Sequence, residues 1–502
     1  MKLARFNPLS MKGTQMVRSK QKNREKRRIR QGKKKGLKKA IEIGPSTPYG
    51  YTQEHLSPYG GLLPLEKFLD AVKFEQLFST MFVEPGRRNR SGSYFFIKGL
   101  VLLLFIGFKR IYHFVYIEED PMLLGLLGVS RLPHVSTFWR YMKSAGINQA
   151  HALVRIMAAL RERAWHALGF DLKRIYIDID TTVEPIYGQI QGARKGHNPK
   201  SRSKKGLRPV LAFIPETKEY LSGKLRRGET ISGAETAKFV RSLRSLLPGS
   251  VKEARIRADA EFFSWDTVEA CMGKGFRFTI AIKRASPLFD PNRWYSHGKK
   301  KGVQYNQCMY QPQGWGGACR FVAMRIPKTL EENTGQDPLF EDDRYKYRIF
   351  VTDSRKSPHN AITEYDLRAG AENLVGEAKR EGVAAIPSKN FQTNMAYFQV
   401  VMLAYNLWRY LKLLSHADTP GEPVLNTVHV SRLKLLFISA KVVTHSHRTT
   451  VKYSAHLKKR AMLDHLFERV ETLREHSNLW TSPLTWQTRC QPSMQKSFCT
   501  AS

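Results

Sequence analysis

The chain has 502 residues, 42% of them apolar, so it is long enough for two to four domains and is not disordered as a whole. Its 83 Lys and Arg residues outnumber its 43 Asp and Glu residues and give a formal net charge of +40. This excess favours a polyanionic partner. Nucleic acid is the leading interpretation and a membrane surface is the alternative.

Cysteine usage and hydropathy narrow the class further. The five cysteines are odd in number and show no CxxC spacing, which disfavours a disulfide framework and a zinc ribbon and suits a reducing cytoplasm. The most apolar run, residues 95–108, is too short to span a bilayer. We interpret it as a buried helix and expect no membrane partner.

The N-terminal third divides into two parts. Residues 1–40 are predicted to form a basic disordered arm, which either neutralises DNA phosphates or is a solvated tail. Residues 41–170 show apolar spacing of three and four residues and are predicted to form a helical DNA-binding domain. Within it, residues 132–146 resemble a recognition helix with Arg140 and Lys143 on its surface, or an ordinary capped core helix.

The pattern changes at about residue 171. Residues 171–284 predict the order strand, strand, strand, helix, strand, helix, strand, which is the order of an α/β ribonuclease-H-like core. Residues 285–345 are predicted to be a β-rich insertion, and residues 346–415 to be the second part of the core, with a long helix over 361–381. Residues 416–502 are assigned to a C-terminal region for DNA binding or dimerisation.

Acidic residues stand where two predicted core strands end. Asp178 and Asp180 are two residues apart and therefore lie on one face of the first strand, while Asp259 ends the fourth. Ligands of α/β sheets collect beyond the carboxyl ends of strands, so these acids can converge. Taken singly, each acid is more often a turn or cap residue than a ligand.

A polar stripe marks the helix predicted over 361–381. Tyr365, Arg368, Glu372 and Lys379 have offsets of 0, 3, 7 and 14, which place them on one narrow helix face. A solvated face would show the same spacing. Two glycines in this segment reduce helix stability, which suggests that the helix closely approaches a backbone or a nucleic acid.

These motifs together resemble a known family. Tyr365-x2-Arg368-x3-Glu372-x6-Lys379 matches the YREK signature of DDE transposases of the insertion-sequence-four type. DTT at 180–182 and RADAEF at 257–262 resemble its first and second acid motifs. The segments PIYGQIQGARKGHNP, KLRRG and AYNL resemble the thirteen-eighty branch, and the resemblance covers about residues 60–470.

The resemblance implies a metal-dependent active site. Asp180, Asp259 and Glu372 would form the DDE triad and bind Mg²⁺, or Mn²⁺ in its place, as a pair of ions. Hard carboxylate oxygens without a His or Cys cluster disfavour zinc. Tyr365, Arg368 and Lys379 would hold the DNA end rather than the metal.

The resemblance also implies a reaction and partners. A transposase of an insertion sequence would bind double-stranded terminal inverted repeats, cleave both strands and join the 3′ ends to target DNA. It would act as a homodimer in the synaptic complex and be associated with the bacterial nucleoid. Hairpin formation would place a flipped base on an aromatic side chain of the insertion, and Trp294 and Trp315 are candidates unless they only form its small core.

Several alternatives remain open. Asp178 competes with Asp180 as the first acid, and Asp180 is preferred because it precedes Thr181 and Thr182. Glu261 follows Asp259 on the same predicted strand face and either perturbs the site or does nothing. Instead of a transposase, the chain could be a ribonuclease-H-like nuclease without strand transfer or a non-catalytic DNA-binding protein.

Overall fold

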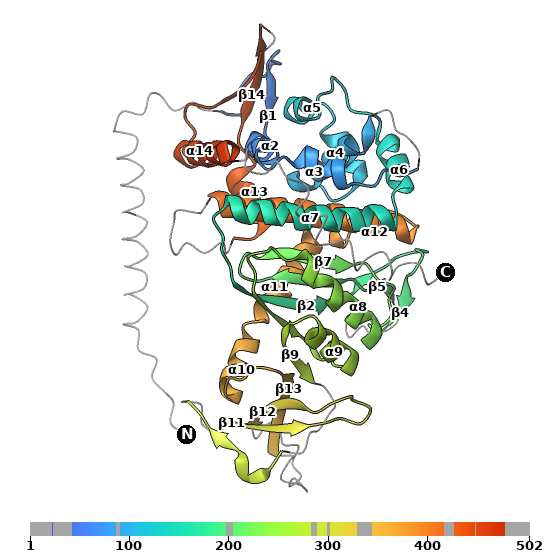
Figure 1. The fold of residues 1–502 in the computed structure, drawn as a ribbon. Coiled ribbons are helices and arrows are strands. Elements are labelled where there is room, and N and C mark those ends of the chain that lie inside the picture. The colour runs from blue at the N-terminus through green and yellow to red at the C-terminus, as the bar shows by residue number, and fades with distance from the viewer. Residues whose placement is uncertain are drawn as a thin grey trace, which may run out of the picture. The chain divides into compact units, whose positions relative to one another are not determined.

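The computed structural model describes residue 23 and residues 43–86, 91–196, 204–282, 289–298, 302–328, 344–415, 426–446 and 448–476 (Figure 1). The chain divides into two compact units, residues 1–54 and 55–502. All helices and strands discussed below belong to the second unit. The basic arm expected over residues 1–40 lies outside the described residues, apart from residue 23.

A nine-stranded mixed sheet forms the centre of this unit, in the order β10-β11-β12-β13-β9-β8-β2-β6-β7. β2 pairs in parallel with β8, and β8 with β9, whereas all other neighbours are antiparallel. The strands are β2 (Arg174–Thr181), β6 (Val210–Ile214), β7 (Glu219–Lys224), β8 (Glu253–Ala258), β9 (Arg277–Ile282), β10 (Tyr295–Ser296), β11 (Gln304–Tyr310), β12 (Cys319–Pro327) and β13 (Tyr345–Thr352).

The expected order of core elements is observed as β2, β6, β7, α8 (Gly233–Leu243), β8, α9 (Trp265–Gly273) and β9. A second, three-stranded sheet was not predicted. It has the order β3-β5-β4 and lies in sequence between β2 and β6, with β3 (Glu184–Pro185), β4 (Arg194–Lys195) and β5 (Lys205–Leu207). Strands of two or three residues are too short to show an alternating pattern.

The segment expected to be a β-rich insertion continues the central sheet. β11 and β12 form an antiparallel pair, β12 pairs with β13, and β13 pairs with β9 through Val351 and Ile280. The described strands of residues 285–345 therefore extend the sheet beyond β9. Backbone hydrogen bonding across β13 and β9 joins them to it, a long-range contact that sequence alone does not reveal.

Helices cover both faces of the core strands. Ile177 and Ile179 of β2 belong to the hydrophobic cluster that α8 and α9 close on one face. Leu211 and Phe213 of β6 belong to the cluster on the other face, which contains α11 (Ala369–Ala378) and α12 (Phe391–Ser415). The alternation along each strand thus buries both faces, as expected for a sheet between two helical layers.

The N-terminal helices share their core with helices from the C-terminal part of the chain (Figure 1). Phe105 stacks on Trp408 at 3.9 Å between ring centroids, and the Trp408 indole donates to the Phe105 carbonyl. We expected residues 41–170 and 416–502 to be separate regions, but they contribute to one apolar cluster. The α-helices are α2 (Leu62–Ala71), α3 (Phe74–Met81), α4 (Gly92–Ile106), α5 (Pro121–Leu127), α6 (Val135–Ser144), α7 (Ile147–Ala167), α13 (Val428–Leu435) and α14 (Arg460–His476).

A small antiparallel sheet strengthens this connection. β1 (His55–Ser57) pairs with β14 (Ala440–His445), which pairs with β15 (Arg448–Tyr453). The Tyr453 hydroxyl also donates to the Gly60 carbonyl. The start of this unit is therefore bonded to strands of the C-terminal part of the chain.

Two helical expectations have clear outcomes. The apolar run at 95–108 lies in α4 and is almost wholly buried, and no helix among the described residues is long and apolar enough to cross a membrane. The single long helix expected over 361–381 is wrong. It is divided into α10 (Pro358–Asp366), α11 and a π-helical segment, Lys379–Val383. At the break, Arg368 N donates to the Tyr365 carbonyl, and Ala371 N donates to the Arg368 carbonyl. Both bonds span three residues, as in a 3₁₀ turn.

Candidate active site

Strand register brings two predicted acids together. Ile179 of β2 lies opposite Ala258 of β8 in a parallel pair, so Asp180 and Asp259 stand side by side one residue further on. Asp259 then leaves the strand and caps a short 3₁₀ turn, accepting a hydrogen bond from Glu261 N at 3.1 Å. Both carboxylates therefore lie at the carboxyl end of adjacent parallel strands, where ligands of such sheets bind.

The third acid comes from the helix layer. Glu372 lies in the first turn of α11, and its side chain is exposed. Burial and, to a smaller extent, the charges of Asp259 and Glu372 raise the pKa of Asp180 to about 6, against the opposing effect of Arg368. The charges of Asp259 and Glu372 therefore both act on the Asp180 carboxyl, and Arg368 opposes them.

The other members of the polar stripe dock on the ends of the same strands. The Tyr365 hydroxyl donates to the Ala258 carbonyl at 3.2 Å, one residue before Asp259. Arg368 donates to the Ile179 carbonyl at 2.9 Å, one residue before Asp180, and lies 3.5 Å from Asp180 Oδ1. The stripe therefore fixes the positions from which both acids project.

Lys379 makes the corresponding contact on the segment after β2. Its ammonium group donates to Thr182 Oγ1 at 3.1 Å and to the Val183 carbonyl at 2.9 Å, and it forms an ion pair with Glu184 at 3.1 Å. Burial raises the pKa of Glu184, and Lys379 opposes that shift. This lysine secures the start of β3 to the π-helical segment.

These contacts change the interpretation of the stripe. Tyr365 and Arg368 are only 8% and 7% exposed, so they are not a solvated face. We expected Tyr365, Arg368 and Lys379 to hold DNA, but each is bonded to a neighbouring strand or its extension. Their position favours a role in orienting the acids, and Arg368 Nε is buried without a hydrogen-bond partner among the described residues.

Asp178 has a different environment from Asp180. It is 1% exposed, and both of its oxygens accept hydrogen bonds from Arg257, at 2.6 and 2.9 Å. Arg257 also donates to the Glu364 carbonyl and lies over the Tyr176 ring. Asp178 is therefore part of a buried bidentate ion pair, and its position supports a structural rather than a metal-binding role.

Glu261 is also fully engaged. Its carboxylate accepts hydrogen bonds from Thr181 at 2.7 Å, from Arg208 at 2.6 Å and from Ile231 N at 3.3 Å. Burial alone would raise the pKa of Glu261, but these donors hold it below its usual value. Glu261 therefore ties the end of β2 to the start of β6.

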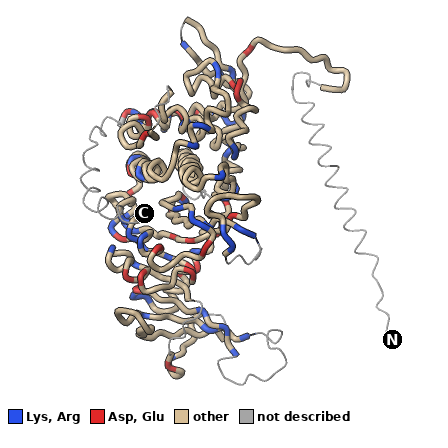
Figure 2. Tube along the Cα trace, turned by 90° about the vertical axis from the view of Figure 1, so that its right-hand side faces the viewer, with Lys and Arg blue, Asp and Glu red and all other residues tan. Residues whose placement is uncertain are grey.

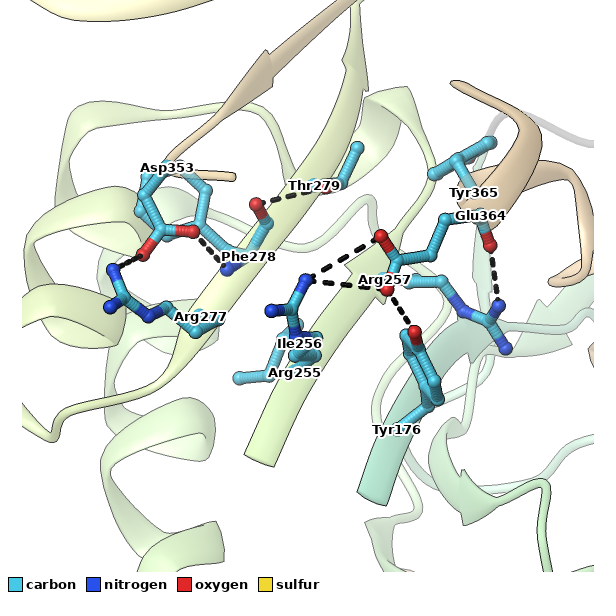
Figure 3. A pocket seen from close by; sticks show the side chains of 10 residues that line it. All are labelled: Tyr176, Arg255, Ile256, Arg257, Arg277, Phe278, Thr279, Asp353, Glu364 and Tyr365. Carbon is cyan, nitrogen blue, oxygen red and sulfur yellow. Dashed lines mark hydrogen bonds and ion pairs between the residues drawn. The ribbon is translucent and has the colours of Figure 1, made fainter. Parts of the chain in front are cut away.

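A polar junction lies on the same side of the sheet, further from the strand ends. Figure 3 shows Tyr176, Arg255 and Glu364 meeting between β2, β8 and α10, around a cavity of about 10 Å³. Glu364 accepts hydrogen bonds from Tyr176 and Arg255 and forms an ion pair with Lys356 at 3.0 Å. The cavity holds no more than about one water molecule, so this junction is a packing feature that seats α10.

This junction predicts a pH dependence of stability. Partial burial would raise the pKa of Glu364, but Tyr176, Lys356 and Arg255 lower it below the ordinary 4.5. A carboxyl whose pKa is lower in the folded state stabilises the fold above its unfolded pKa and loses that contribution as pH falls. Glu364→Gln should therefore flatten the decrease in unfolding free energy below about pH 4.5, measured by urea denaturation at a series of pH values. The control is Glu269→Gln, at an exposed position on α9. The prediction is contradicted if the unfolding free energy decreases equally at acidic pH in the wild type and in both variants.

Both candidate tryptophans are packed against neighbours. Trp315 lies in an aromatic group with Phe263, Trp265 and Phe321. Trp294 lies under the Arg325 guanidinium at 4.4 Å. Each is half-buried, and Trp315 packs against the hydrophobic cluster of the central sheet rather than in a separate core of residues 285–345.

The residues present fit a divalent cation by chemistry. Three carboxylates without His or Cys are the hard donors that Mg²⁺ and Mn²⁺ prefer, and the charges of Asp259 and Glu372 contribute to the raised pKa of Asp180. Their oxygens are not arranged as a finished site, since no group of three His, Cys, Asp or Glu in the described part of the chain is close enough to hold an ion. Glu372 is the exposed member, on a helix turn that begins at the break after α10.

Comparison with known proteins establishes the class. A family model described as "Transposase DDE domain group 1" matches residues 51–475. The chain belongs to this family of DDE transposases, and its role is DNA transposition. A solved structure described as a piggyBac transposase synaptic complex with hairpin DNA is similar over 86% of this chain and 85% of that chain, with 12% identity and a TM-score of 0.41. No curated protein sequence matches the chain.

Sequence reasoning missed the partners that define the roles of the acids. Arg257, Arg208 and Glu184 each form an ion pair beside the site, with Asp178, Glu261 and Lys379 respectively. Arg257 had a signal, because it precedes Asp259 by two residues and therefore lies on the same strand face. Glu184 lies in β3 and Arg208 lies just after β5. Because these strands are too short to show an alternating pattern, neither residue had a signal in the sequence.

Proposed function

We propose that this chain is the transposase of an insertion sequence, of the insertion-sequence-four type and thirteen-eighty branch, with a ribonuclease-H-like catalytic core. The observation that supports the proposal is that Asp180 and Asp259 end adjacent parallel strands, where the charges of Asp259 and Glu372 act on the Asp180 carboxyl. The YREK residues support it, because Tyr365, Arg368 and Lys379 dock on those same strand ends or just beyond them.

The proposed reaction is cleavage of both strands at terminal inverted repeats, followed by joining of the 3′ ends to target DNA. Two divalent cations, Mg²⁺ or Mn²⁺, would activate the attacking oxygen and stabilise the leaving oxygen. Asp180, Asp259 and Glu372 would hold them. The raised pKa of Asp180 means that this carboxyl retains a proton more readily than usual, and cation binding would release it.

The surrounding residues would set the geometry. Tyr365 and Arg368 bind the backbone carbonyls just before Asp259 and Asp180. These hydrogen bonds would hold the two carboxylates at fixed positions relative to each other. Pairing of two transposon ends would require two copies of the chain, and we propose a homodimer on DNA.

A cleavage assay on the element's own ends tests this function. With Mg²⁺, the wild type should release the ends and produce joined products with target DNA, and both should disappear with a chelator. Cuts without joined products would identify a nuclease that lacks strand transfer. Binding without metal-dependent cuts would identify a non-catalytic DNA-binding protein.

Arg368→Lys distinguishes orienting from DNA holding. Lys lacks the planar fork that reaches both the Ile179 carbonyl and Asp180, so cleavage should fall by about 10- to 100-fold, as for partners that orient metal ligands. DNA affinity and its salt dependence should stay close to wild type, with Arg241→Lys on the surface of α8 as control. If affinity weakens and the salt slope falls by about 1 while cleavage of bound DNA is unchanged, the side chain serves mainly as a phosphate contact.

A further inference from the structure

The small β3-β5-β4 sheet contains a repeated chemical pattern. Three triplets each consist of two basic residues and a glycine, and they come from β4, from β5 and from the segment after β7. They are Arg194-Lys195-Gly196, Lys204-Lys205-Gly206 and Arg226-Arg227-Gly228. The pattern brings six cations to one region from three separate parts of the chain.

The glycines explain how the triplets come together. A Cβ on Gly196 would overlap the carbonyl oxygen of Gly228, and a Cβ on Gly228 would overlap that of Gly206. Backbone therefore packs directly on backbone, which only glycine permits. Arg208 N also donates to the Arg226 carbonyl at 3.1 Å, and this bond joins the end of β5 to the segment after β7.

Five of the six cations, all except Arg226, are exposed, and some lie close together. Lys195 lies directly opposite Lys205 in the antiparallel β4–β5 pair, and like charges in that position are destabilising. Arg227 lies beside them on an open groove of about 600 Å³, which Gln191 and Arg194 also line. Figure 2, which views the molecule from the side of β4 and β5 in Figure 1, shows Lys and Arg gathered in this part of the chain.

Local acids offset little of this charge. Glu229 forms an ion pair with Arg194 at 2.9 Å, and Glu235 accepts from the buried Arg226 at 2.5 Å. Lys195, Lys205 and Arg227 keep exposed side chains. These cations lie close together despite their mutual repulsion, on backbone segments that pack through glycines. Such an arrangement suits a ligand with repeated negative charges.

The groove is attached to the acidic site by the backbone. β3 begins at Glu184, four residues after Asp180, and Glu184 pairs with Leu207 of β5. Lys379 secures the same point through Val183 and Glu184. A chain of phosphates lying along the groove would thus lead toward the carboxyl end of β2.

We propose that Lys195, Lys205 and Arg227 form a phosphate platform that holds the backbone of one DNA strand as it enters the acidic site. This inference rests on the proposed transposase function, since it identifies where the DNA substrate lies. The contacts are to phosphates, so the platform contributes affinity and orientation without reading base sequence.

A charge-matched pair of triple variants tests the platform. Lys195→Gln/Lys205→Gln/Arg227→Gln removes its three cations, and Arg174→Gln/Lys252→Gln/Lys274→Gln removes three exposed cations near the opposite ends of β2, β8 and β9. Affinity of the full chain for a DNA duplex of fixed length is measured in metal-free buffer over a range of salt concentrations. Each phosphate contact contributes about 0.9 to the salt slope, so the platform variant should lose about 2 to 3.

At about 0.1 M salt this loss corresponds to at least about tenfold weaker binding, and the control variant should remain near wild type. Equal losses in both triple variants would show a general charge effect and overturn the platform. Unchanged binding by the platform variant would overturn it as well. If the platform variant alone loses affinity but the wild type makes no metal-dependent cuts, the platform stands and the proposed function fails.

Discussion

Glu372→Gln should abolish metal-dependent DNA cleavage while leaving DNA binding nearly unchanged. The substitution keeps the size and shape of the side chain but removes the charge with which it would hold a cation. A metal ion contributes several kcal/mol to the transition state, so we expect cleavage to fall by at least about 10³-fold. Asp180→Asn and Asp259→Asn should have the same effect, because both lie at the meeting point of the strands.

The measurement is a time course of end cleavage with Mg²⁺, alongside DNA affinity in its absence. Glu269→Gln on α9 is the matched control, because Glu269 is exposed on a helix of the opposite face. We expect its cleavage to equal that of the wild type. Unchanged cleavage by Glu372→Gln would remove this residue from the active site, and the proposed triad would then be wrong.

Asp178→Ala should destabilise the fold by about 3 to 5 kcal/mol, because it leaves Arg257 buried without its carboxylate partner. The measurement is the unfolding free energy from chemical denaturation. Asp171→Ala is the control: its ion pair with Lys173 is on the surface, where such pairs contribute at most about 1 kcal/mol. Replacing both members, as Asp178→Leu/Arg257→Met, should restore much of the lost stability because no unpaired charge remains.

This experiment also separates the two adjacent candidates for the first acid. If Asp178→Ala were as stable as the wild type yet failed to cleave DNA, the catalytic role would pass from Asp180 to Asp178. If it unfolds more easily but cleaves at permissive temperature, its role is structural. Asp180→Asn should show the reverse, with lost cleavage and little change in stability.

Local pattern was sufficient to predict the strands that carry the acids. Asp180 and Asp259 end strands whose alternation is visible in the sequence, and general topology places such ends together. The same alternation could not separate Asp178 from Asp180, since a period of two puts both on one face. The difference arises from Arg257, which reaches Asp178 only through the register of two strands distant in sequence.

The helix stripe was predicted for a reason that is only partly correct. Its spacing assumed an unbroken helix, whereas the chain breaks between α10 and α11. Leu367 and Arg368 keep helical backbone angles across the break, so Tyr365 and Arg368 still face the strand ends. The break itself depends on tertiary packing against β2 and β8, which local propensity does not encode.

The pairing of β1 with β14, and the apolar cluster that α2 shares with α14, have a consequence for biosynthesis. A ribosome must translate about 400 residues after α2 before α14 emerges to cover it. During this time the apolar surface of α2 stays exposed. Gene copies interrupted by a stop codon upstream of β14 should therefore yield proteolysed fragments. Such fragments would be poor competitors for the intact protein in the same cell.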